Sequence, residues 1–438
     1  MRSDNNIVAD GKSNSLTDIV ERLRNGSISA DGYLNQLEEK FNRIEPQIHA
    51  FIPETDRFKR LRRDLADLIK KYPDPQNRRP LFGIPVAIKD LYHVDGFETR
   101  AGSQLPPEVL KGEEGEIVKS LKAAGALILG KTVTTEFAYF APGPTRNPHN
   151  LNHTPGGSSS GSAAAVAAGL TPLAFGTQTI GSIIRPAAYC GVVGFKPSQG
   201  RVSTSGIIPL APSMDQVGMF TSDVESAEYI SSILFKDWRI KTETAPNKFV
   251  IPEGPYLKNA DIAALKHFEG VCKLLTNSGF DIISMQMMND FDEIAHTHKR
   301  LVAAESALVH KEWFARFSNQ YHPKTAELIR SGQAISSIEL EQCRRSCSKL
   351  RDDIVRLMDN HNIDAILSPS APSPAPFGLE STGDPVMNLP WTHAGLPVIN
   401  IRSGMSSDKL PFGLQITGKY GFDEELLQVT KELKKSLE

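Results

Sequence analysis

The chain has 438 residues, of which 40% are hydrophobic and 23% are charged, and this composition is typical of a soluble globular protein. The formal net charge of −2 provides no basic field for nucleic acid, and no apolar run approaches the roughly 20 residues that span a bilayer. The first residues contain no apolar secretory signal, and the chain has only four cysteines. We therefore expect a cytoplasmic protein that contacts neither nucleic acid nor a membrane.

The first third of the chain predicts helices followed by two short strands. Residues 14–44 contain two amphipathic helical patterns that are separated near Gly26. Residues 56–72 form a charged helical pattern whose leucines make a core-facing stripe. Residues 80–92 lead from turn residues into an apolar strand, and residues 115–132 give a helix, a glycine and a second strand.

The second half of the chain alternates strands with helices. Strands are predicted over 248–253 and 364–369, and helices over 261–280 and 338–361, while the Pro-rich stretch 369–376 is a loop. This alternation favours an α/β domain with a substantially parallel sheet that is covered on both faces. We expect one domain over residues 1–438, in which the helices near 285–360 form a cap over a site.

A phosphate-binding pattern, G-x-x-x-x-G-K-[ST], occurs at residues 125–132 and ends in Lys131 and Thr132. Such a loop needs a strand before it and a helix that begins at the Lys-Thr pair. Here a helix precedes the pattern, "ALIL" is itself strand-like, and β-branched and aromatic residues follow. A buried strand that ends in a Gly-Lys turn is the better interpretation, and a P-loop nucleotide binder is the least favoured function class.

Residues 156–163 read "GGSSSGSA" and contain G-x-S-x-G, the nucleophile-elbow pattern, centred on Ser159. An elbow follows a buried strand, whereas Asn, His and Pro residues precede this stretch. Asp384 and His393 could complete a triad, but their sequence context does not distinguish them from other acids and histidines. An S-x-x-K pattern at Ser346 lies in a charged helix and is interpreted as a solvated face.

Two further features place polar groups in apolar surroundings. Lys89 lies near the end of the apolar strand within residues 80–92 and shares a face with Ala87. Its amine either reaches solvent or is partly buried, in which case desolvation lowers its pKa and makes it a base near neutral pH. The glycine-rich residues 176–191 contain Ser182 and form either an ordinary turn or an oxyanion hole of backbone N–H groups. These residues alone leave both alternatives open.

Several segments resemble, in the same order, the core of the amidase signature family. They are "GIPVAIKD", "ALILGKTVTTEFAYF", "TRNPHN", "TPGGSSSGSAAAVAAG" and "GTQTIGSIIRPAAYCGVVGFKPSQGRVS", followed by "PWTHAGLPVINI", "LPFGLQITG" and "FDEELL" near the C-terminus. The resemblance covers most of the chain from about residue 14 and is weakest between residues 235 and 350. It implies an α/β fold with a large mixed central β-sheet covered by helices on both faces.

The resemblance also implies a Ser–cisSer–Lys triad. Carried over by motif, Ser182 is the nucleophile, Ser158 the bridging serine and Lys89 the base, and the peptide bond between Gly157 and Ser158 is cis. In the implied cycle the nucleophile attacks an amide carbonyl, and its proton passes through the bridging hydroxyl to the neutral lysine. Water then hydrolyses the acyl-enzyme.

The backbone N–H groups of Thr179, Ile180, Gly181 and Ser182 are the oxyanion donors that the resemblance implies. The cycle requires no cofactor and no metal. Many family members carry "DTGGS" where this chain has "QTIGS", so Gln178 replaces an acid and Ile180 a glycine. The larger side chain of Ile180 narrows the site and restricts its φ angle.

Arg185 follows the expected nucleophile by three residues instead of the more frequent two. This "S-I-I-R-P" spacing resembles malonamidase-type members of the family, in which an arginine binds a substrate carboxylate. A bidentate arginine–carboxylate contact would suit that role. The alternative is a structural arginine that is paired with a buried acid.

The leading function prediction is a stand-alone amidase, a serine hydrolase that cleaves the C–N bond of linear amides, with carbamates (a urethanase activity), anilides or esters as further substrates. Its partners are then a small amide or carbamate molecule and water, and a homodimer is compatible with the sequence. The second prediction is the glutaminase subunit of a tRNA-dependent amidotransferase, although "QTIGSIIRP" departs from the form associated with that subunit.

Overall fold

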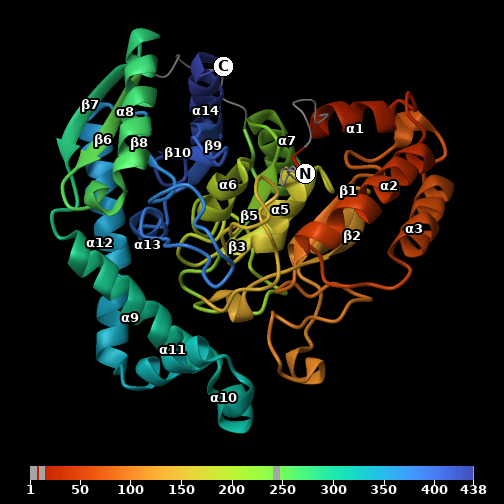
Figure 1. Cartoon of the computed structure of the whole chain (residues 1–438), viewed down its shortest axis with the longest axis horizontal. Coiled ribbons are helices and arrows are strands. Elements are labelled where there is room, and N and C mark those ends of the chain that lie inside the picture. Colours follow the sequence, from red (N-terminus) through yellow and green to blue (C-terminus); the bar gives the residue numbers. More distant parts are fainter. Residues whose placement is uncertain (1–6, 9–14, 240–246, 438) are drawn as a thin grey trace.

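The computed structural model describes residues 7–8, 15–239 and 247–437, and a ten-stranded sheet runs through it (Figure 1). The strand order is β2-β1-β3-β5-β4-β9-β10-β8-β6-β7. The strands are β1 Pro85–Lys89, β2 Leu127–Thr132, β3 Leu173–Gln178, β4 Val193–Lys196, β5 Gln216–Thr221, β6 Lys248–Glu253, β7 Asp281–Gln286, β8 Ala365–Pro369, β9 Val398–Met405 and β10 Pro411–Thr417.

The sheet is mixed, with parallel strands at its two ends and antiparallel strands in its centre. β1 pairs in parallel with β2 and β3, and β6 pairs in parallel with β7 and β8. The central pairs β3–β5, β5–β4, β4–β9, β9–β10 and β10–β8 are antiparallel. The predicted α/β class and large mixed sheet are confirmed, whereas a substantially parallel sheet describes only the two ends.

Helices cover both faces of the sheet. α1 Leu16–Arg24, α4 Glu116–Ala123, α7 Val224–Leu234 and α14 Asp423–Leu437 pack on the face that Val86 and Ile88 share. The opposite face, which contains Ala87, is covered by α2 Ala30–Ile48, α3 Arg57–Lys71, α5 Ser160–Ala167, α6 Ile184–Cys190 and α13 Leu389–His393. α8 Ile262–Asn277 lies beside the β6–β7 end of the sheet (Figure 1).

The helical and strand predictions are confirmed in type, and several helix starts have a local cause. The Ser29 side chain caps α2, and the Asp261 side chain accepts from the Ala264 N–H at the start of α8. Ser336 and Glu339 form a reciprocal capping box at the start of α12 Ser337–His361. The Pro-rich stretch after β8 is a loop, as predicted.

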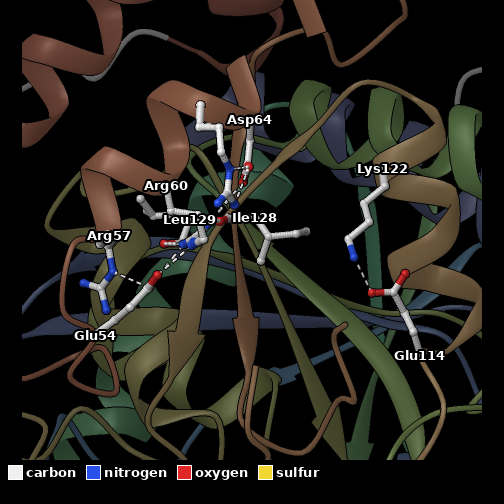
Figure 2. A network of polar contacts seen from close by, with 9 residues as sticks. Glu54, Arg57, Arg60, Asp64, Glu114, Lys122, Ile128 and Leu129 are labelled. Carbon is white, nitrogen blue, oxygen red and sulfur yellow. Dashed lines mark hydrogen bonds and ion pairs between the residues drawn. The ribbon is translucent and has the colours of Figure 1, made fainter. Parts of the chain in front are cut away.

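Residues 127–132 of the phosphate-loop pattern form a fully buried strand, β2, and only Gly125 and Ala126 of the pattern precede it. Hydrogen bonds join this strand to α3 (Figure 2): Arg60 donates to the carbonyl oxygens of Ile128 at 2.8 Å and Leu129 at 3.2 Å. The Lys131 Nζ donates to Asp90 Oδ1 at 2.7 Å, and both side chains are buried. The interpretation of these residues as a buried strand is therefore confirmed.

The predicted helical region near 285–360 is formed by α9 Phe291–Val309, α10 Lys311–Phe317, α11 Pro323–Gln333 and the long α12. A cavity of about 570 Å³ lies between α9 and α12, and none of Lys89, Ser158 and Ser182 lines it. The role of this region as a cap over the active site stays a prediction. Among the described residues, no helix combines the length and apolar character needed to cross a membrane.

Candidate active site

Lys89 lies at the end of β1, on the sheet face covered by α5 and α6, and its side chain is completely buried. Its Nζ donates to Ser158 Oγ at 2.7 Å and to Thr177 Oγ1 at 2.8 Å. Burial lowers the pKa of Lys89 well below its ordinary value, while the negative charge of Asp215 acts in the opposite direction. Of the two alternatives left open by the sequence, the structure has the buried amine.

Ser158 follows a cis peptide bond from Gly157, as the family resemblance predicts. Gly156 has a φ of +83°, a conformation that favours glycine, and a Cβ on Gly157 would come within 2.7 Å of Thr382 Cγ2. The two glycines therefore allow a backbone path that places the Ser158 hydroxyl on the amine of Lys89. Arg185 Nη2 donates to the Gly157 carbonyl oxygen at 2.7 Å, so it holds the carbonyl group of the Gly157–Ser158 peptide.

The other serines of the "GGSSSGSA" stretch anchor it to its surroundings. The Ser159 hydroxyl is buried and donates to the Thr177 carbonyl oxygen at 3.2 Å, so its proton is engaged in a hydrogen bond within the protein. Ser160 Oγ donates to the Gly156 carbonyl oxygen at 2.8 Å, and Ser162 Oγ to that of Phe175 at 2.9 Å. Ser159 occupies the N-cap position of α5 without a side-chain capping hydrogen bond.

Ser182 lies in the loop between β3 and α6, and 6% of its surface is exposed. Within the described residues, its hydroxyl has no direct hydrogen bond to Ser158, so the structure shows the Lys89–Ser158 half of the expected proton path. The backbone N–H groups of Thr179, Ile180, Gly181 and Ser182 make no hydrogen bond to another described residue.

The loop packs closely against the segment before α13. A Cβ on Gly181 would clash with Asn388 Oδ1 and come within 2.8 Å of Pro385 Cβ, so only glycine fits there. Ile180 is 9% exposed, and its side chain belongs to the hydrophobic core on this face of the sheet. The substitution at this family position is therefore accommodated by burial of the side chain.

Arg185 is buried, and its guanidinium contacts oxygen atoms of the protein. Nη1 donates to the Gly383 carbonyl oxygen at 3.0 Å, and Nη2 also approaches Thr382 Oγ1 at 3.2 Å. Burial lowers the pKa of Arg185 to about 10, while Tyr189 and Asp384 act in the opposite direction. Its partners are thus carbonyl and hydroxyl groups, where the structural alternative expected a buried acid. Binding of a substrate carboxylate by Arg185 stays a prediction.

Asp215 is a buried acid that the sequence analysis did not single out. Its Oδ1 accepts from Thr179 Oγ1 at 2.5 Å, and its Oδ2 accepts from the N–H groups of Leu210 and Ala211 at 2.8 and 3.1 Å. Burial raises its pKa to about 6. The only available signal was one acid just before an apolar strand, since its contact with Thr179 joins residues far apart in the chain.

The arrangement brings together a desolvated amine, a hydroxyl bonded to it, a second serine and a loop whose N–H groups have no partner among the described residues. Acyl transfer requires a base, a relay hydroxyl, a nucleophile and an oxyanion site, and groups of these chemical kinds are present here. In the described part of the chain, no group of three or more His, Cys, Asp or Glu side chains is placed to hold a metal ion.

Comparisons with known proteins agree with this geometry. The family model described as Amidase matches residues 34–427. The A subunit of glutamyl-tRNA(Gln) amidotransferase from Sulfolobus acidocaldarius is 31% identical, with 96% of this chain and 98% of the relative covered. The protein of the same name from Prochlorococcus marinus is 29% identical, with 96% and 97% covered.

Solved structures agree as well. An amidase crystal structure superposes with a TM-score of 0.87 at 29% identity, covering 96% of this chain and 99% of the other. The native peptide amidase from Stenotrophomonas maltophilia has a TM-score of 0.80 at 24% identity, covering 98% and 97%, which shows the shared fold. With its fold, its Lys89–Ser158 contact and these matches, the chain belongs to the amidase signature family.

Proposed function

We propose that this protein is an amide hydrolase that works through an acyl-enzyme, with Ser182 as nucleophile, Ser158 as relay and Lys89 as base. The observation that carries the proposal is the 2.7 Å hydrogen bond between Lys89 Nζ and Ser158 Oγ at a completely buried lysine. A lysine whose pKa is lowered by burial has a larger neutral fraction at a given pH than an ordinary exposed lysine. The neutral amine offers a lone pair that can accept the Ser158 proton.

The first part of the proposed acylation forms one bond and relays two protons. The Ser182 oxygen adds to the amide carbonyl carbon, its proton passes to Ser158, and the Ser158 proton passes to Lys89. The negative charge develops on the carbonyl oxygen, toward which the N–H groups of residues 179–182 can donate, since they have no hydrogen-bond partner among the described residues. Collapse of the tetrahedral adduct breaks the C–N bond, and the proton returns from Lys89 to the leaving amine.

In the proposed deacylation, water attacks the ester of Ser182 and its proton follows the same path to Lys89. The carboxylic acid product leaves when Ser182 regains its proton. The proposed substrates are linear amides, with carbamates, anilides and esters as further candidates, since all present a carbonyl carbon with a leaving group. Tyr139 and Phe140 form a half-buried aromatic pair, with ring centroids 4.6 Å apart, that could contact an apolar acyl or aryl group.

A substrate panel tests this proposal. Primary amides, p-nitroanilides, carbamates and monoamides of dicarboxylic acids are incubated with the wild type and with Ser182→Ala. We expect hydrolysis of at least one amide class by the wild type and none by a folded Ser182→Ala variant. Retention of amide hydrolysis by that variant would remove Ser182 from the proposal. A preference for the dicarboxylic monoamides would support Arg185 as a carboxylate-binding residue.

A second candidate is the glutaminase subunit of a tRNA-dependent amidotransferase, and the curated relatives at 29–31% identity favour it. The replacement of "DTGGS" by "QTIGS" in this chain weighs against it. Co-purification from the source cell distinguishes the two. A second chain and tRNA that remain bound, with glutamine hydrolysis that depends on them, would support the amidotransferase function. Turnover of small amides by the isolated chain supports the stand-alone enzyme.

A further inference from the structure

The side chain of Gln178, at the end of β3, is completely buried beside the proposed nucleophile. Its Oε1 accepts hydrogen bonds from the backbone N–H groups of Ile183 at 2.7 Å and Ile184 at 3.0 Å. These are the two N–H groups that follow Ser182 in the chain and begin α6. Gln178 thus ties the end of β3 to the start of α6, on either side of the loop that holds the proposed oxyanion donors.

The amide nitrogen of Gln178 makes a second contact, on α13. Nε2 donates to Thr392 Oγ1 at 2.8 Å, and Thr392 Oγ1 lies 2.6 Å from the Ile180 carbonyl oxygen, to which it donates. The hydroxyl has one proton, and the Ile180 oxygen is a nearer acceptor than the Asn388 carbonyl oxygen at 3.2 Å. Donation to Ile180 leaves the lone pairs of the hydroxyl to accept from Gln178. A carboxylate at position 178 could not donate, and it would compete with the Ile180 carbonyl for the Thr392 proton.

The contact with Ile180 also orients the next N–H group. In a planar trans peptide, the C=O of Ile180 and the N–H of Gly181 point in opposite directions. The bond from Thr392 therefore draws the Ile180 oxygen toward α13 and turns the Gly181 N–H away from it. That N–H makes no hydrogen bond to another described residue, which leaves it available to a ligand.

We propose that Gln178 and Thr392 are positioning residues that together aim the Gly181 N–H at the developing oxyanion. The proposal rests on the proposed function, in which Ser182 forms the acyl-enzyme. It gives a physical reason for the glutamine at the position where many family members carry an acid: this loop needs a side chain that accepts from Ile183 and Ile184 and also donates to Thr392.

The test compares Thr392→Val, which keeps the shape but loses the hydroxyl, with Thr392→Ser, which keeps the hydroxyl. Loss of one oxyanion donor costs on the order of 100-fold to 1000-fold in kcat, so a misaligned donor should cost roughly 10-fold to 100-fold. We expect Thr392→Val to lower kcat by that factor at nearly unchanged KM, with the acid limb of the pH profile in place, and Thr392→Ser to restore most of the rate.

Thr417→Val is the matched control, because Thr417 is also a buried threonine and its hydroxyl has no hydrogen-bond partner among the described residues. We expect this variant to keep the wild-type kcat. A Thr392→Val variant with wild-type kcat, or a Thr392→Ser variant as slow as Thr392→Val, would overturn the proposal. A rise in KM at constant kcat would do the same, since it would indicate a role in ground-state binding.

Gln178→Glu provides a second line of evidence if Thr392→Val fails to fold. It is nearly isosteric, keeps an acceptor for Ile183 and Ile184, and loses the donor to Thr392. We expect a lower kcat at retained KM, and a double variant with Thr392→Val no slower than about the slower single variant, because both act through one carbonyl. If the kcat losses of the two single variants multiplied in the double variant, the two residues would act independently, which would contradict their action through the Ile180 carbonyl. If instead Ser182→Ala stays active, the proposed function itself fails, so the two failures are distinguishable.

Discussion

At the scale of single residues, burial determines the chemistry of Lys89. A lysine at a strand end ordinarily extends to solvent, but here β1 lies inside the sheet and α5 closes over its end. The amine then has two hydroxyl partners, Ser158 and Thr177, and no ion-pair partner among the described residues. Desolvation favours the neutral amine, which is the form that a base needs.

The first prediction contrasts two adjacent serines. Ser158→Ala removes the hydroxyl bonded to Lys89 and should lower kcat by about 100-fold to 10,000-fold, the usual contribution of proton transfer. Ser159→Ala removes a structural hydrogen bond to Thr177 and should instead lower the free energy of unfolding by about 1–3 kcal/mol, with the activity of the folded protein retained. Steady-state kinetics and urea denaturation separate the two effects. An inactive, folded Ser159→Ala beside an active Ser158→Ala would favour the nucleophile elbow.

The second prediction concerns the pH dependence of kcat/KM. The Asp215 carboxylate raises the pKa of Lys89, so Asp215→Asn should lower that pKa further and shift the acid limb of the profile to lower pH. The pKa of Asp215 is raised to about 6, so the charge that the variant removes is fully present only above that pH. Asp292→Asn, which changes an exposed acid on α9, should leave the limb in place. A shift of the limb to higher pH would contradict the assignment of Lys89 as the base.

Sequence reasoning predicted part of the candidate site because local motifs mark it. Gly156, Gly157 and Ser158 stand together in one stretch, and the cis bond that the family resemblance implies there is present. Asp215 and Thr392 were missed because their contacts with the Thr179–Ile180 segment join distant parts of the chain. Such contacts depend on the sheet order and the position of α13, which no local pattern encodes.

At the scale of secondary-structure elements, the pairing of β1 with β2 sets the position of Lys89. The parallel register places Lys89 beside Thr132, and the buried pair Asp90–Lys131 joins the ends of the two strands. The strand–helix alternation predicts the parallel ends of the sheet. It does not predict the antiparallel centre, where β9 and β10 follow each other with only the short turn 406–410 and no helix between them. The position of this pair within the sheet depends on long-range pairing, which the alternation does not show.

The third prediction concerns this buried ion pair. Lys131→Met leaves the Asp90 carboxylate buried without its partner and should lower the free energy of unfolding by about 3–5 kcal/mol, measured by urea denaturation. Adding Asp90→Asn should recover part of the loss, since no buried charge then remains. The same experiment tests the phosphate-loop alternative. Magnesium-dependent ATP binding by the wild type that is lost in a folded Lys131→Met variant would favour a nucleotide binder.

At the scale of the whole molecule, one chain supplies every group of the candidate site. Lys89 comes from β1, Ser158 from the segment before α5, and Ser182 from the loop before α6, so all three residues of the proposed triad belong to one chain. Helix α13, from the C-terminal part of the chain, contacts the loop of the proposed oxyanion donors through the hydrogen bond from Thr392 to Ile180. The fold therefore brings residues separated by about three hundred positions to one side of the sheet.

The fourth prediction concerns the dependence of activity on the oligomeric state. If the chain forms a homodimer, its dissociation should leave the specific activity unchanged, because all three residues of the proposed triad come from one chain. Specific activity measured over a dilution series, with the oligomeric state followed by light scattering, checks this. An activity that falls in step with dissociation would place part of the active site at a dimer interface.

The identity of the nucleophile is the central claim, and covalent labelling tests it most directly. The protein is treated with a fluorophosphonate, which forms a stable ester with an activated serine, and the modified peptide is identified by mass spectrometry. We predict one label on Ser182, absent from folded Ser182→Ala and Lys89→Ala variants. A label on Ser159, or labelling that persists in Ser182→Ala, would contradict this assignment.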